Sequence, residues 1–317
     1  MKFHASFLLF ITLTVGSANA ANLLGYYAFE GNYDATGGGP AAAPAMNPGE
    51  LSFASGFRGQ SLNVNDPTAD NNSGGSVNIP INANAASNPD VSFGGWVNVE
   101  SFEFDGFLAT DNGGWDRGIT VNGQGSGAFG IASGAAPAHV GPITPGSWQY
   151  VLGTFSRSNN RSTLYVGSAI LGEQTTLSVS TVDANDVGES FIEIGRYDNQ
   201  DLNALVDDVF VFGDELTSHQ ANAIRNLRLS LNLSPAEADA LFDMFDASSE
   251  GSVGGLDWSL TSGLDATNPG GVLDLGGGQY GLVLDDAGNG LLAVPEPSVT
   301  LLGGLAALFF LARRRRC

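Results

Sequence analysis

The stretch Val91-Ser92-Phe93-Gly94-Gly95-Trp96-Val97-Asn98-Val99 decides the fold, because its apolar side chains alternate with other residues along the chain. Neighbouring side chains of a strand point to opposite sides, so Val91, Phe93, Val97 and Val99 share one face. A strand with one apolar face is typical of a sheet that packs against a second layer. We therefore predict a strand here that is buried against such a layer.

Similar short apolar runs lie on both sides of this stretch, separated by Gly, Asn, Asp and Pro. These runs are Leu23–Phe29, Ser76–Ile79, Trp148–Phe155, Thr163–Val166, Phe191–Ile194 and Leu205–Phe212. Their number and spacing predict an all-β fold, an antiparallel jelly-roll sandwich. The chain has 317 residues and a hydrophobic fraction of 43%, which is enough for a sizeable core.

Short helices and further strands are predicted after the sandwich. Thr217 and Gln220 form a capping-box pattern, and Ser234-Pro235 begins a second helix. Later apolar runs predict a small β-rich region that ends in a hairpin over residues 280–294. The expected organisation is a signal peptide at 1–20, the sandwich at 21–229, a helix-plus-hairpin region at 230–294 and a sorting signal at 295–317.

Charge and cysteine content exclude several classes of protein. The formal net charge is −21, which repels nucleic-acid phosphates, so we expect no nucleic-acid partner. Cys317 is the only cysteine, so neither an internal disulfide nor a cysteine-based zinc site is possible. The three histidines, His4, His139 and His219, are too far apart in sequence to match a metalloprotease helix.

Both ends of the chain carry targeting features. Lys2, the apolar run from Phe7 to Val15 and the small-x-small site Ala18-Asn19-Ala20 predict a secretory signal peptide. At the other end Val294-Pro295-Glu296-Pro297 precedes an apolar segment, predicted to be a membrane helix over 298–312. Its apolar core is short for a ~30 Å hydrocarbon layer. The basic end, Arg313, Arg314, Arg315 and Arg316, is expected to remain cytoplasmic.

This tail resembles the PEP-CTERM sorting signal of Gram-negative bacteria, with Pro295, Glu296 and Pro297 at the motif and the arginines at the end. The resemblance implies an exosortase, a membrane protease that removes the tail. It also implies export, a transient stay in the inner membrane, and then the cell surface or the exterior. The alternative is an ordinary C-terminal anchor.

The sandwich region resembles the LamG-like domain of the concanavalin A-like lectin/glucanase superfamily over roughly residues 21–229. The resemblance rests on motifs in the family's order, which are Leu24–Asn32, Gly56–Leu62, Phe93–Val97, Trp148–Val151, Leu164–Gly167, Ile194–Arg196 and Val206–Phe212. It implies a domain that binds carbohydrate or matrix components.

Two aspartates in the last of these strands need a physical explanation. Strict alternation places Asp208 on the same side as Val206, Phe210 and Phe212. A carboxylate among apolar neighbours must be hydrogen-bonded or bound to a cation. A structural hydrogen bond to loop amides is the first alternative.

Calcium is the cofactor that the superfamily suggests. By analogy with pentraxins, Asp116 and Asp198 stand at positions of acidic metal ligands. Arg117 stands where a second oxygen ligand is expected, and Asn199 and Asp201 could supply further oxygens to Ca²⁺. An acidic solvated loop is the alternative.

Glycoside hydrolysis by a sandwich glucanase requires two carboxylates on one strand. Glu103-Phe104-Asp105 begins such a pattern, but Phe107 and Leu108 occupy the places of the second glutamate. We therefore expect an exported, non-enzymatic protein that binds carbohydrate or exopolysaccharide. The alternatives are a purely structural matrix protein and a glycoside hydrolase. An exposed Trp115 or Trp96 over a sheet would favour binding.

Overall fold

The computed structural model describes residues 23–35, 39–57, 59–68, 73–101, 104–110, 112–113, 115–169, 174–179 and 188–216, together with Ser218, Ala221, Ile224, Arg225 and four later strands. The predicted signal peptide, the second predicted helix, the Pro-Glu-Pro motif and the tail at 298–317 lie outside the described residues. Within the described part, no helix has the length and apolar character needed to cross a membrane.

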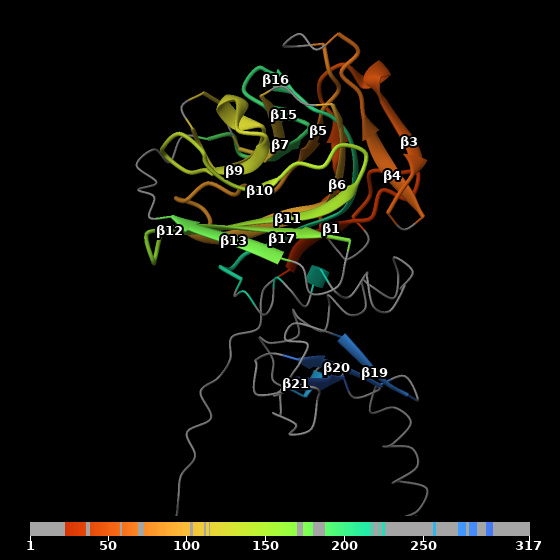
Figure 1. Ribbon diagram of the computed structural model, residues 1–317, viewed down its shortest axis with the longest axis vertical. Helices are drawn as coiled ribbons and strands as arrows, with labels where there is room; N and C mark the ends of the chain where they lie inside the picture. Colours follow the sequence, from red (N-terminus) through yellow and green to blue (C-terminus); the bar gives the residue numbers. More distant parts are fainter. Residues whose placement is uncertain are drawn as a thin grey trace, which may run out of the picture.

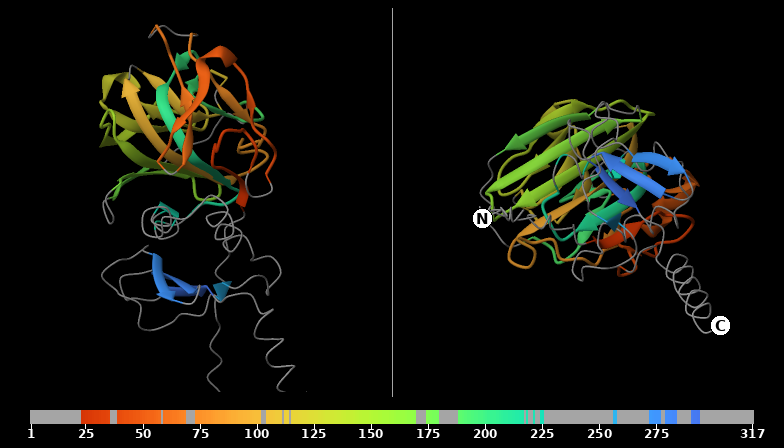
Figure 2. Two further views of the ribbon diagram at one scale, coloured as in Figure 1. Left: turned by 90° about the vertical axis from the view of Figure 1, so that its right-hand side faces the viewer. Right: turned by 90° about the horizontal axis from the view of Figure 1, so that it is seen from below.

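Two antiparallel sheets form the sandwich, and Figure 1 shows them as two layers, with β9 and β10 above β11 and β17. The first sheet has eight strands in the order β13-β12-β11-β6-β17-β4-β3, with β1 also paired to β17. Its strands are β1 (Leu23–Tyr27), β3 (Leu51–Ser55), β4 (Gln60–Val64), β6 (Asp90–Ser101), β11 (Trp148–Ser156), β12 (Arg161–Ser168), β13 (Gln174–Val179) and β17 (Asn203–Phe212). Figure 2 shows this sheet from below, with its strands side by side.

The second sheet has seven strands in the order β10-β9-β8-β7-β14-β5-β2. These strands are β2 (Ala43–Pro44), β5 (Val77–Ile79), β7 (Asp105–Ala109), β8 (Gly118–Val121), β9 (Ala128–Ala132), β10 (Ala138–Pro142) and β14 (Ile192–Ile194). A short hairpin of β15 (Arg196–Tyr197) and β16 (Gln200–Asp201) follows β14, and two 3₁₀ turns are η1 (Pro48–Glu50) and η2 (Gly123–Gly125).

The described residues of the predicted helix after Leu216 are helical, and the predicted late strands are present. Ser218, Ala221, Ile224 and Arg225 are helical. The late strands form a four-stranded sheet of their own, in which β20 and β21 make the expected antiparallel hairpin. Its strands are β18 (Leu256–Asp257), β19 (Val272–Gly276), β20 (Gln279–Val283) and β21 (Gly290–Ala293).

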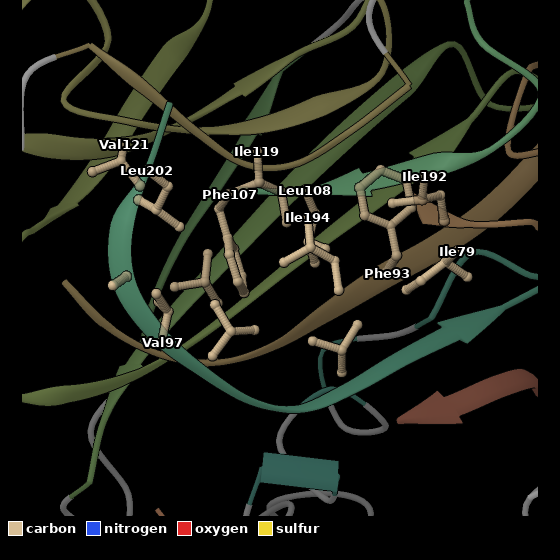
Figure 3. Close-up of a cluster of buried hydrophobic side chains, with 14 of the residues drawn as sticks. Ile79, Phe93, Val97, Phe107, Leu108, Ile119, Val121, Ile192, Ile194 and Leu202 are labelled. Atoms are coloured by element: carbon tan, nitrogen blue, oxygen red, sulfur yellow. The ribbon is translucent and has the colours of Figure 1, made fainter. Parts of the chain in front are cut away.

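The core lies between the two sheets, as Figure 3 shows, where Phe93 and Val97 of β6 face side chains of the second sheet such as Phe107. Val91, Phe93, Val97 and Val99 are all fully or almost fully buried in this core. The predicted apolar face of the deciding stretch is therefore confirmed.

Strict alternation fails in β17, where the sequence placed Val206 on the same side as Phe210. Val206 and Val209 both point into the core, so two residues, Asp207 and Asp208, separate two inward side chains. The pairing with β6 shifts between Asp207 and Phe210, which marks a β-bulge, and Asp208 has a φ of 48°. Because of the bulge, Asp208 shares its side with Phe210 and Phe212 but not with Val206, so the predicted grouping is wrong for Val206.

The Asp208 carboxylate meets the expectation of a hydrogen bond. It is 2% exposed and accepts a hydrogen bond from the Tyr26 hydroxyl of β1. This donor is a side chain of a neighbouring strand, whereas the sequence suggested loop amides.

Candidate functional site

The outward face of the seven-stranded sheet is the candidate site. Core side chains such as Ile119, Ile131, Ile192 and Ile194 point inward, so the residues between them point away from the core. Cross-strand pairing arranges these residues in two rows across the sheet. The first row is Ala43, Asn78, Glu193, Ala109, Gly118 and Ala132, and the second is Gly106, Thr120, Gly130 and His139. Small residues therefore form most of this face.

The β15–β16 hairpin lies directly on this face because two glycines make room for it. A Cβ atom on Gly118 would lie 2.4 Å from the ring of Tyr197, and one on Gly106 would lie 2.2 Å from the Tyr197 backbone nitrogen. The Tyr197 hydroxyl donates a hydrogen bond of 3.1 Å to the backbone carbonyl of Asp116. The hairpin and the loop before β8 are thereby joined.

An aromatic stack stands on the small residues. The Trp115 ring packs against Ala109, Ala132 and Tyr197. The Phe104 ring stacks on Trp115 with centroids 5.9 Å apart and 24° between the ring planes. Both Phe104 and Trp115 are partly exposed. The stack thus offers an aromatic surface to solvent on the outward face.

Trp115 holds its position in an unusual backbone conformation. Its φ is 65°, in the left-handed region that bulky side chains rarely adopt. Such a conformation costs on the order of 1–3 kcal/mol and persists where the surrounding structure imposes it. Here the Gly134 amide donates a 2.6 Å hydrogen bond to the Trp115 carbonyl, which ties the loop to the chain after β9.

The sequence pointed to either Trp115 or Trp96 as the exposed tryptophan, and only Trp115 qualifies. Trp96 is 1% exposed on the other sheet, where it stacks on Phe57 at 4.0 Å between centroids. Tyr150, next to it, donates a 3.0 Å hydrogen bond from its hydroxyl to the Ala221 carbonyl of the helical segment.

Asp116, the first predicted calcium ligand, is 3% exposed, and its Oδ2 accepts a hydrogen bond of 3.3 Å from the Asn112 amide. Its neighbour Arg117 is also buried, and the guanidinium donates to the carbonyls of Ala83, Asn88 and Pro89 at 2.6–3.0 Å. Arg117 therefore secures the 83–89 loop.

Asp198, the second predicted ligand, is exposed in the turn between β15 and β16, with a φ of 54°. Asn199 and Asp201, which the sequence suggested as further oxygen ligands, both contact Arg196. Its guanidinium donates to Asn199 Oδ1 at 3.2 Å, and its Nε lies 3.6 Å from Asp201 Oδ1. Among the described residues, no group of three or more His, Cys, Asp or Glu side chains is placed to hold a metal ion. Calcium binding at Asp116 and Asp198 stays a prediction.

Glu193 is a site residue that the sequence reasoning missed. It lies beside Ala109 in the first row, on the adjacent strand. Trp115 packs on this same alanine. Burial raises the pKa of the Glu193 carboxyl above the usual value of 4.5, against the opposing effects of the Ser76 hydroxyl and of Arg196. The alternation Ile192-Glu193-Ile194 already indicated a carboxylate on the side opposite the core.

The residues of the glucanase pattern are only partly described. Phe107 and Leu108 are both fully buried in the core, so neither place of the second glutamate faces outward. Asp105 is 5% exposed, and Glu103 lies outside the described residues.

Residues 71–222 match the model of a protein family described as the concanavalin A-like lectin/glucanases superfamily. No curated protein matches the chain. The similar solved structures include the binding domain of botulinum neurotoxin serotype D, at 13% identity and a TM-score of 0.46, covering 64% of this chain and 51% of that one.

Two further structures have similar scores. Trypanosoma rangeli sialidase with the inhibitor DANA has 14% identity and a TM-score of 0.47, covering 67% of this chain and 33% of that one. A protein of unknown function from Shewanella oneidensis MR-1 has 15% identity and a TM-score of 0.40, covering 63% of this chain and 90% of that one. The chain thus spans about half of the toxin domain and a third of the sialidase.

Proposed function

Because residues 71–222 form a LamG-like domain of the concanavalin A-like superfamily, we propose that this protein binds carbohydrate on the outward face of its seven-stranded sheet. The observation that carries the proposal is the partly exposed stack of Phe104 on Trp115. An aromatic ring offers a flat apolar surface to the C–H face of a sugar, and binding sites combine such surfaces with a few polar groups.

The small residues around the stack support this assignment. Ala109, Gly118 and Ala132 leave room on the sheet for Trp115 and Tyr197, which cover them, so the stack rests on a buried base. The loop is also held in place before any ligand arrives, by Tyr197 and by the Gly134 amide. A site that is already ordered loses less conformational entropy on binding.

The test is a glycan array of the full chain, followed by calorimetry with the strongest ligand. Trp115→Ala should weaken binding by at least tenfold, which corresponds to about 1.4 kcal/mol. Trp148→Ala is the matched control, since Trp148 is another partly exposed tryptophan, close to Phe57 on the other sheet. Equal affinity in Trp115→Ala and the native protein would refute the proposed site.

The function we propose is binding without hydrolysis, because Phe107 and Leu108 fill the places of the second carboxylate. The expected result is no release of reducing ends from β-glucans. Release that disappears in Glu103→Gln would identify a glycoside hydrolase instead. A purely structural matrix protein would show no ligand on the array.

We also propose that the protein is exported and sorted by an exosortase through Pro295, Glu296 and Pro297. An exopolysaccharide outside the cell is then the natural partner of the site. The support for this part is the order of motif, apolar segment and arginines at the C-terminus.

A further inference from the structure

Glu193 and Asn78 form a pair of hydrogen-bond acceptors beside the Trp115 stack. They are direct cross-strand partners in β14 and β5, on the outward face. Glu193 is partly exposed. Asn78 Oδ1 is buried and has no hydrogen-bond partner among the described residues. A buried acceptor without a donor is costly, by about 1–3 kcal/mol, and calls for an explanation.

The carboxylate of Glu193 is held in a fixed position. The fully buried Ser76 donates its hydroxyl proton to Glu193 Oε1, and the Ser76 oxygen in turn accepts a 3.2 Å hydrogen bond from the Met46 amide. A serine hydroxyl has one proton, so this arrangement orients the donor toward the glutamate. The carboxylate is therefore preorganised at the edge of the stack.

The charges around Glu193 are mainly negative. Among these charges Arg196 has the largest single effect and lowers the pKa of Glu193, while Asp201 and Glu189 both raise it. Arg196 is also in contact with Asp201 and Asn199, so its charge is shared. A ligand with an anionic group here would face three carboxylates, whereas a ligand that carries a cationic donor would lower the repulsion.

We infer that Glu193 and Asn78 select a sugar with a protonated amino group, placed next to the ring that stacks on Trp115. An ammonium group has only donors, which suits a carboxylate and an amide oxygen that need them. Glu193 and Ala109 are on adjacent strands, about 4.8 Å apart, so one ligand can reach both the carboxylate and the stack. This inference rests on the proposed function and adds the ligand class.

The test measures affinity of the full chain, at pH 6 and 150 mM salt, for three tetrasaccharides. These are a glucosamine tetramer, its N-acetylated counterpart, which is neutral, and a galacturonate tetramer, which is anionic. We expect the amine to bind at least tenfold more tightly than the N-acetylated sugar and the anionic sugar to bind most weakly.

Glu193→Gln should bring the amine to within about threefold of the N-acetylated sugar, while binding of the N-acetylated sugar itself stays unchanged. Asp34→Asn is the control for long-range attraction, because it removes the same charge from an exposed acid outside the candidate site. Asn78→Asp, which adds a carboxylate, should increase the preference for the amine and serves as a second variant.

The inference is overturned if the native protein binds the amine and the N-acetylated sugar equally, or if Asp34→Asn reduces the preference as much as Glu193→Gln does. In both cases the loss of binding in Trp115→Ala still supports the proposed function. If the array and all three tetrasaccharides show no binding, the proposed function itself fails.

Discussion

Arg117 shows how one residue takes a role that its position in the sequence hides. Its place in the family pattern suggests a missing metal ligand, yet its guanidinium satisfies three backbone carbonyls between Ala83 and Pro89. It also lies 5.8 Å from the centroid of the Phe155 ring. An arginine has five N–H donors in a rigid fork, and a buried one is retained where carbonyls need those donors.

We predict that Asp116 and Asp198 bind calcium. Added Ca²⁺ should raise the melting temperature, since an ion that binds only the folded state stabilises it by mass action, by about 2.7 kcal/mol at 100 times Kd. The shift should be lost in Asp116→Ala and in Asp198→Asn. Asp34→Asn, at an exposed acid elsewhere, should keep it. A full shift in Asp116→Ala contradicts the assignment.

Glu193 should make stability depend on pH. Because burial raises its pKa in the folded state, the folded protein binds this proton more tightly than the unfolded chain does. The stabilisation from the proton is fully present below the unfolded pKa, near 4.5, and is lost as pH rises through the folded pKa. Glu193→Gln should therefore be more stable than the native protein at pH 7, and the difference should vanish near pH 4. Urea unfolding across this range measures it, and a constant difference would argue against the burial effect.

At the scale of elements, β17 pairs with three strands, and its bulge lies where one pairing partner gives way to the next. Before the bulge, residues 204–206 pair with β4, and after it, residues 209–212 pair with β1. The opposite edge pairs with β6 on both sides of the bulge. The positive φ of Asp208 is part of this arrangement, and the Tyr26 hydroxyl of β1, in the same sheet, donates a hydrogen bond to the Asp208 carboxylate.

Tyr26→Phe tests this connection between β1 and β17. The substitution removes a hydroxyl donor from a buried carboxylate, so we expect a loss of about 1.5–3 kcal/mol in the free energy of unfolding. Tyr27→Phe, in the same strand, removes a 2.8 Å bond to the neutral carbonyl of Pro40 and should cost about 1 kcal/mol. Urea denaturation compares the two, and equal losses would show that the charge of Asp208 is not significant here.

At the scale of the whole molecule, acidic residues outnumber basic ones, and the formal net charge is −21. Four arginines are clustered near the C-terminus. This separation of charge agrees with the proposed orientation, in which the arginines stay inside and the acidic part lies outside. An acidic protein at the surface also suits the inferred preference for amino sugars, since attraction at long range raises association rates.

The sorting proposal predicts a mature protein that ends near Pro297 and lacks Arg313, Arg314, Arg315, Arg316 and Cys317. Pro295 and Pro297 have no backbone donors and disfavour a helix, so the segment should be extended and accessible to a protease. Intact-mass measurement of protein released from the surface tests this. A mature species that retains residues 299–317 would show that the tail is an ordinary anchor.

The sequence by itself determined the fold class and seven of the fifteen strands of the sandwich, because alternation and apolar runs indicate which side chains are buried. Every predicted strand of the sandwich is present, and the core side of Val91–Val99 is as expected. The targeting features predicted for both ends also rest on local patterns, and they stay predictions.

Only the tertiary structure decided the candidate site, because its members come from distant parts of the chain. Register between β5, β14 and β7 places Asn78, Glu193 and Ala109 in one row, and the hairpin brings Tyr197 into contact with Trp115. The bulge in β17 changed the side on which Asp208 lies, since one extra residue reverses the alternation. Such contacts depend on pairing between strands, and no local pattern in a single strand specifies its partner.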